Sequence, residues 1–62
     1  MTNHQATLAA RLARLEGEER DLEVDLREAN REGLAAWAKA LRAERRHVWR
    51  LLEATEEALR TA

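Results

Sequence analysis

Hydrophobic residues recur along the first half of the chain at alternating spacings of four and three. The series runs Leu8, Leu12, Leu15, Glu19, Leu22, Leu26 and Ala29. Helices that pack lengthwise against another helix carry this a/d repeat, and here it has one polar member. Thr2 and Gln5 have the spacing of a capping box, which places a helix start near Asn3. The repeat therefore predicts a helix over about residues 3–29.

A second series of the same kind occupies the other half of the chain. It runs Leu34, Trp37, Leu41, Glu44, Val48, Leu51, Thr55 and Ala58, again with one acidic member. The two series are out of phase, because five positions separate Ala29 from Leu34. Between them lie Asn30 and Gly33, residue types that tolerate the backbone of helix ends. We expect a turn at residues 30–33 and a second helix over about 33–60. A single long helix with a one-residue skip is the alternative.

Folding the chain about Arg31 and Glu32 brings residues whose numbers sum to 63 opposite each other. The resulting layers are Leu26 on Trp37, Leu22 on Leu41, Glu19 on Glu44, Leu15 on Val48 and Leu12 on Leu51. One hairpin leaves half of each apolar stripe in water, and Leu52 and Leu59 widen the stripe of the second helix. We therefore expect residues 1–62 to form a single all-α domain, an antiparallel hairpin that pairs with a second copy into a four-helix bundle.

The composition of the chain bears on which kinds of partner and chemistry are expected. The 62 residues include 11 basic and 12 acidic side chains, which are interspersed and give a net charge of −1. This balance gives no reason to expect nucleic acid as a partner. No run approaches the ~20 apolar residues of a membrane span, and no signal peptide is visible, so we expect a cytoplasmic protein. The absence of cysteine excludes disulfides and thiolate metal sites.

Candidate chemistry comes from the polar members of the two series. In the expected dimer, two copies each of Glu19, Glu44 and His47 converge on one central layer, where the carboxylates need protonation or a counter-charge. His47 follows Glu44 by three residues, so both side chains can bind one cation from the same helix face. Carboxylates and imidazoles suit iron, manganese or zinc, and a pair of divalent cations per dimer supplies about the right charge. Glu16 or Glu23 could accept a hydrogen bond from the histidine.

Glu19 in one helix and Glu44-Arg45-Arg46-His47 in the other resemble the ligand pattern of the ferritin-like di-iron carboxylate proteins. A one-hairpin chain that completes its site by dimerising is most similar to the encapsulated-ferritin type and to designed di-iron hairpins. The resemblance implies a di-iron centre with Glu19, Glu44 and His47 as ligands. It also implies oxidation of Fe(II) by oxygen, a ferroxidase-type activity.

The same polar layer has a non-catalytic interpretation. A buried polar layer can fix the register and oligomeric state of packed helices, with arginines pairing with the carboxylates while reaching solvent. The chain would then be a dimeric interaction module. Under both interpretations we expect the dimer interface to include Leu12, Leu15, Leu22, Leu41, Val48, Leu51, Leu52 and Trp49. Trp49 falls on the outer side of the second helix, where an exposed tryptophan often marks a contact with another protein.

Overall fold

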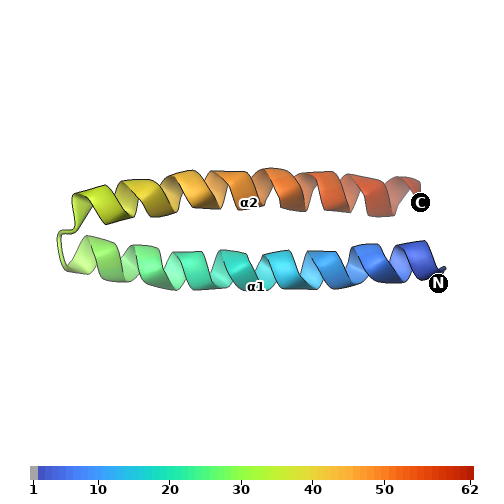
Figure 1. The fold of residues 1–62 in the computed structure, drawn as a ribbon, viewed down its shortest axis with the longest axis horizontal. Helices are drawn as coiled ribbons and strands as arrows, with labels where there is room; N and C mark the ends of the chain where they lie inside the picture. Colours follow the sequence, from blue (N-terminus) through green and yellow to red (C-terminus); the bar gives the residue numbers. More distant parts are fainter. Residues whose placement is uncertain (1) are drawn as a thin grey trace.

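The computed structural model describes residues 2–62 and consists of two long helices joined by a tight turn. Helix α1 spans Asn3–Arg31 and helix α2 spans Ala35–Thr61. The helices run antiparallel and side by side, and both termini lie at the same end of the rod (Figure 1). The Cα trace measures 46 × 14 × 11 Å. The predicted all-α hairpin is confirmed, and the described residues contain no strand.

The start of α1 follows the predicted capping box. The Gln5 backbone N–H donates to Thr2 Oγ1 over 3.1 Å, and the Thr2 N–H donates to Gln5 Oε1 over 2.9 Å. This reciprocal pair satisfies backbone donors that a helix N-terminus otherwise leaves without a partner. The cap therefore fixes the first turn of α1 at the residues the sequence indicates.

The turn that joins the helices is built around Gly33. Its φ of 69° lies in the left-handed region, which glycine enters without the clash that a Cβ would cause. The Leu34 N–H donates to the Ala29 carbonyl over 2.9 Å, and the Gly33 N–H donates to the Asn30 carbonyl over 3.2 Å. This pair of bonds is the Schellman motif, which closes a helix with glycine just past its last helical residues. Gly33, rather than Asn30, therefore ends α1.

The position of this turn corrects the predicted register. Helix α1 continues to Arg31, and α2 begins at Ala35 instead of at residue 33. The hairpin thus folds about Gly33, one and a half positions later than the predicted point between Arg31 and Glu32. The residue of α2 that faces a given residue of α1 is consequently displaced by about three positions. A small error in the turn changes every layer of the hairpin.

The buried residues of α1 are those of the predicted series. They are Leu8, Leu15, Leu22, Leu26 and Ala29, with Leu12 half-buried against the same core. Along α2 the buried residues are Ala38, Leu41, Val48, Leu52 and Thr55. The core of the hairpin is therefore a single row of side chains between the two helices. None of the large side chains in residues 2–62 is completely shielded from solvent.

Three predicted core positions of α2 are wrong for the single hairpin. Trp37 and Leu51 are 40 % and 41 % exposed, and Glu44 is also exposed. Their places are taken by the following residues, Ala38, Arg45 and Leu52. Because Glu44 is exposed and Glu19 is bonded to Trp49, the layer of Glu19 on Glu44 does not form in the single hairpin. Helix α2 is thus rotated relative to the predicted hairpin, and this rotation is favourable. Burying the Glu44 carboxylate without a partner would cost several kcal/mol. Arg45, in contrast, can bury its aliphatic stem and keep its charge near the surface.

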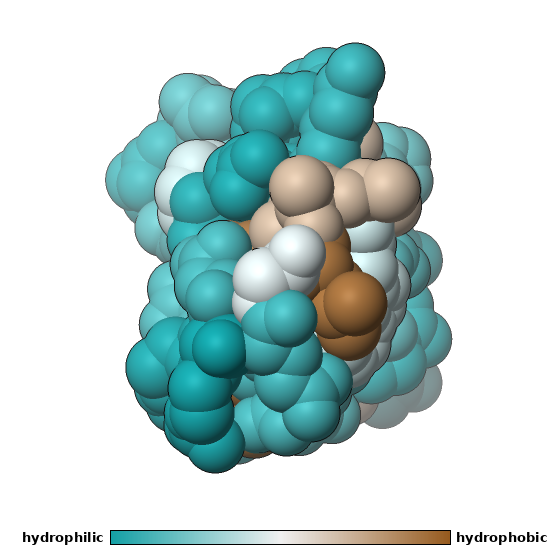
Figure 2. Space-filling view, turned by 90° about the vertical axis from the view of Figure 1, so that its left-hand side faces the viewer, coloured by the Kyte–Doolittle hydropathy of each residue, from teal (hydrophilic) through white to brown (hydrophobic). Residues whose placement is uncertain are grey.

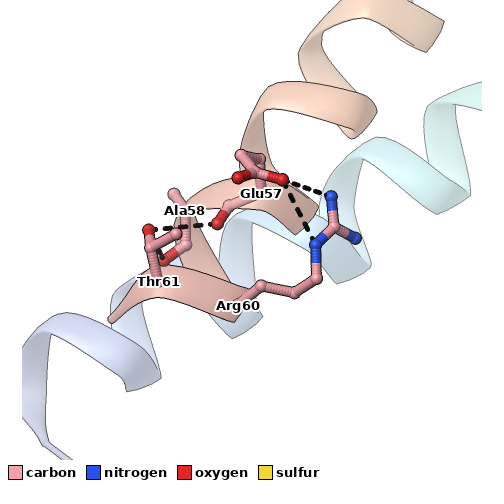
Figure 3. A network of polar contacts seen from close by, with 4 residues as sticks. All are labelled: Glu57, Ala58, Arg60 and Thr61. Carbon is pink, nitrogen blue, oxygen red and sulfur yellow. Dashed lines mark hydrogen bonds and ion pairs between the residues drawn. The ribbon is translucent and has the colours of Figure 1, made fainter.

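Local polar contacts join neighbouring residues at the C-terminal end of α2 (Figure 3). The Arg60 guanidinium donates to the Glu57 carboxylate, with the Nε bond at 3.2 Å. The Thr61 hydroxyl donates to the Glu57 carbonyl over 3.1 Å and to the Ala58 carbonyl over 3.3 Å. The hydrogen bond to Glu57, assisted by its negative charge, raises the pKa of Arg60. These polar groups of α2 are therefore satisfied by partners within the same helix.

Within residues 2–62, neither helix has a segment that is both long and apolar enough to cross a membrane.

Candidate functional site

Glu19, the acidic member of the first series, is engaged inside the hairpin. Its side chain is half-buried, and its Oε2 accepts a short hydrogen bond from the indole Nε1–H of Trp49. The Arg45 guanidinium carbon lies 4.6 Å from the centroid of the Trp49 ring, within the range of a cation–π contact. The Arg45 Nε is buried and has no hydrogen-bond partner. Glu19, Arg45 and Trp49 thus form a small polar cluster that links α1 to α2.

The sequence did not predict this cluster. Trp49 was expected to be an outer residue available to a partner protein, and 42 % of its surface is exposed, but its indole N–H is used within the hairpin. The two bonded residues have numbers that sum to 68, which the fold point between Arg31 and Glu32 does not allow. The signal that could have found the contact was Gly33. A left-handed glycine there moves the fold point toward the observed pairing.

Glu44 and His47 lie on a different side of the hairpin from Glu19. Both are exposed. Glu44 precedes Trp49 by five positions, which is about 140° around a helix, and His47 precedes it by two, which is about 200°. Since Glu19 is bonded to Trp49, it points away from Glu44 and His47. These three side chains do not converge within the single hairpin, and their predicted convergence in a dimer stays a prediction.

The three predicted metal ligands of one chain do not form a metal site on their own. Among residues 2–62, no group of three or more His, Asp or Glu side chains is arranged to hold a metal ion. Glu16 and Glu23 lie three positions before and four positions after Glu19, so they share its side of α1. Within one hairpin they are turned away from His47, which they were expected to orient. Metal binding by Glu44 and His47 stays a prediction that requires a second copy.

One side of the hairpin, which we name the groove face, carries two shallow grooves between the helices. The groove near the termini is lined by Leu8, Arg11, Arg14, Leu15, Leu51, Ala54, Thr55 and Ala58. The groove nearer the turn is lined by Glu18, Asp21, Leu22, Asp25, Leu41, Glu44 and Val48. Residues seven apart lie on the same side of a packed helix. Glu44, Leu51 and Ala58 therefore place both grooves on one side, and Trp37 extends the same row.

The two helices contribute different chemistry to the groove face. Helix α1 supplies a charged rim at alternating spacings of three and four, with Arg11 and Arg14 toward the termini and Glu18, Asp21 and Asp25 toward the turn. Helix α2 supplies an apolar stripe that consists of Trp37, Leu51, Ala54 and Ala58 and is interrupted by Glu44. The face is thus divided lengthwise into a charged half and an apolar half.

A small hydrophobic patch continues this surface around the turn end of the rod, which is otherwise mainly hydrophilic in the view of Figure 2. The patch is formed by Gly33, Leu34, Ala35, Ala36 and Trp37. Leu34 is 46 % exposed, because the Schellman turn directs the chain away from the core before α2 begins. Trp37 belongs to both the patch and the groove face, so the exposed apolar surface is continuous at this end.

Comparisons of the chain with protein-family models, with curated proteins and with solved structures found no match in any of the three. The features available for a functional inference are therefore those of the molecule itself. They are the groove face, the cluster of Glu19, Arg45 and Trp49, and the exposed pair of Glu44 and His47.

Proposed function

We propose that this chain is a non-catalytic self-association module whose groove face packs against a second copy. The observation that carries the proposal is the exposure of Trp37 and Leu51. They are separated by two seven-residue repeats and therefore lie on the same side of α2. Trp37 is continuous with the apolar patch at the turn, and Leu51 with Ala54 and Ala58. Contiguous exposed apolar surface is uncommon on monomeric proteins and marks interaction surfaces. Leu51 lines the groove near the termini and Trp37 lines the patch at the turn end, which gives that surface a defined place.

The size of the chain supports the same proposal. A chain of 62 residues is near the limit at which one core can stabilise a fold, and this hairpin has only a single row of core residues. Trp37 and Leu51 are 40 % and 41 % exposed, so burying the rest of either side chain would add roughly 0.6–1.2 kcal/mol. A second copy on the groove face would turn the single row into the interior of a four-helix bundle.

The test is the mass of the protein in solution, compared between two matched variants. We expect about twice 7.1 kDa by light scattering at micromolar concentration. Leu51→Glu places a charge in the apolar stripe and should shift the protein toward the monomer. Val24→Glu is the control, because Val24 is exposed and lies two positions from both Leu22 and Leu26, on the outer side of α1. A monomeric parent protein, or equal effects of the two variants, would contradict the proposal.

A second candidate function is binding of divalent metal, iron in the first place, where two copies meet. It is favoured by the exposure of Glu44 and His47 next to the apolar stripe, because self-association through that stripe would bring two such pairs near each other. Glu19 could join them only if its bond to Trp49 broke and its side chain crossed to the other side. Oxidation of Fe(II) by oxygen would be an activity of such a centre. Its test is whether divalent metal stabilises metal-stripped protein and whether Glu44→Gln abolishes that effect.

A further inference from the structure

We infer that the second copy lies on the groove face with its turn at the opposite end, so that α1 packs on α1 and α2 packs on α2. This inference rests on the proposed self-association and adds an orientation to it. A two-fold axis perpendicular to the helices and within the interface produces this arrangement. The alternative axis runs along the rod, puts both turns at the same end, and packs α1 of each copy on α2 of the other.

The lengthwise division of the groove face decides between the two axes. With the turns at opposite ends, the apolar stripe of α2 meets the same stripe of the second copy. With both turns at the same end, the charged rim of α1 would lie over that stripe, and Arg11 and Arg14 would cover Leu51, Ala54 and Ala58. Desolvating charged side chains against apolar ones is unfavourable unless they are paired. Packing apolar side chains on apolar ones therefore favours the dimer in which the two turns lie at opposite ends.

The order of charges along α1 supports the same axis. The midpoint in sequence between Arg11 and Asp25 is residue 18, and the midpoint between Arg14 and Asp21 falls between residues 17 and 18. Reversing a second α1 about that point brings Arg11 to the level of Asp25 and Arg14 to the level of Asp21. The two Glu18 side chains meet at the centre, so the α1 rims make four contacts of opposite charge and one of like charge. Opposite charges that meet across an interface fix its register and disfavour other alignments.

The apolar stripe of α2 has its own centre at the same height of the rod. The midpoint in sequence between Trp37 and Ala58 falls between residues 47 and 48, and the pair of Glu44 and Leu51 has the same midpoint. Reversal about this point packs the large Trp37 on the small Ala58. It brings Glu44 to the level of Leu51, so contact between charged and apolar side chains is limited to these two symmetric places. It also separates the two Glu44 side chains by seven residues, about 10 Å along a helix. Since folding about Gly33 places residue 18 of α1 opposite residue 48 of α2, one axis satisfies both helices.

The orientation can be measured with spin labels, because the chain contains no cysteine. We would attach a spin label to the exposed turn through Glu32→Cys. Pulsed electron paramagnetic resonance would then give the distance between the two labels, and the mass would be measured on the same sample. Opposite turns predict a separation on the order of 40 Å, the length of a helix of this size. A distance on the order of 20 Å in a dimeric sample would overturn the orientation and leave self-association standing. A monomeric mass would overturn both.

Charge exchange tests the pairing on which the orientation depends. Arg14→Glu should weaken the dimer roughly tenfold, because it sets like charges opposite each other in two symmetric places. Adding Asp21→Arg to the same chain should restore most of the lost affinity. Within one helix the two residues are seven positions apart and do not meet, so rescue requires the second copy. Additive losses in the double variant would contradict the pairing.

Discussion

The indole N–H of Trp49 donates a hydrogen bond to the carboxylate of Glu19, thirty residues earlier in the chain. The bond joins the middle of α1 to the middle of α2, far from the turn. The Arg45 guanidinium also lies over the Trp49 ring, so the indole contacts charged groups of both helices. The two helices are therefore connected by a polar contact that fixes their register and their rotation, in addition to the row of core side chains.

The first prediction concerns this contact. Trp49→Phe removes the donor and leaves the half-buried Glu19 carboxylate without its partner, which should lower the stability by about 1–2 kcal/mol. For a chain of this size that corresponds to a decrease in melting temperature of roughly 4–15 °C. Thermal unfolding followed by circular dichroism, at one fixed protein concentration, measures the change. A double cycle with Glu19→Gln separates the pair from the loss of indole surface, and a coupling near zero would show that the bond does not contribute.

The second prediction uses the two glycines, which should respond to the same substitution with opposite signs. Gly33→Ala forces a Cβ into a φ of 69° and should destabilise the hairpin by about 1 kcal/mol. Gly17→Ala is the matched control, because Gly17 is helical and its added Cβ would meet no atom closer than Arg20 Nη2 at 3.9 Å. It should stabilise α1 by up to about 1 kcal/mol. Equal shifts of the melting temperature would contradict the role of Gly33 as the left-handed end of α1.

The third prediction distinguishes the observed α2 core from the one indicated by the heptad pattern. Leu52 is 7 % exposed and should lose about 2–5 kcal/mol of stability as Leu52→Ala. Leu51 is the core residue of the pattern but is an exposed groove residue in the structure. Leu51→Ala should weaken self-association more than it lowers the helicity of the separated chain. Urea titrations at several protein concentrations measure both effects, and a larger loss for Leu51→Ala at the lowest concentration would contradict the observed register.

These comparisons show why the sequence predicted one helix better than the other. In α1 the leucines Leu15, Leu22 and Leu26 of the a/d series each have charged residues on both sides, so the buried face of this part of the helix was unambiguous. In α2, Trp37 and Leu51 have the apolar neighbours Ala38 and Leu52, so two adjacent rows are both consistent with a seven-residue repeat. The choice between them depends on where the chain turns. Asn30 and Gly33 are both helix-ending types, and only the backbone conformation shows that Gly33 supplies the left-handed residue.

The predicted metal site depended on that same choice. Placing Glu44 in the core row put it opposite Glu19, and the combination with His47 then had the composition of a metal centre. In the observed rotation Glu44 is on the groove face, and Glu19 is bonded to Trp49. Spacing along a helix identifies which residues share a face. It does not identify which face is turned toward the other helix, and the cluster of Glu19, Arg45 and Trp49 settles this.

The last prediction separates metal binding from self-association alone. If Glu44 and His47 of two copies bind cations, Fe(II), Mn(II), Co(II) or Zn(II) should stabilise metal-stripped protein. The gain is about 2.7 kcal/mol when free metal is a hundred times its dissociation constant. Glu44→Gln and His47→Ala should each abolish that gain, whereas His4→Ala, at the exposed start of α1, should retain it.

Glu19→Gln is the informative third variant of this metal test. It should keep the metal response if only the groove face supplies ligands, and lose it if Glu19 leaves Trp49 to join the site. Where a response is found, Fe(II) mixed with oxygen should give ferric absorbance faster than buffer alone if the centre is oxidative. Unchanged melting curves with all four metals would exclude the metal function and leave the self-association module, because that function depends on Trp37 and Leu51 and on no ligand.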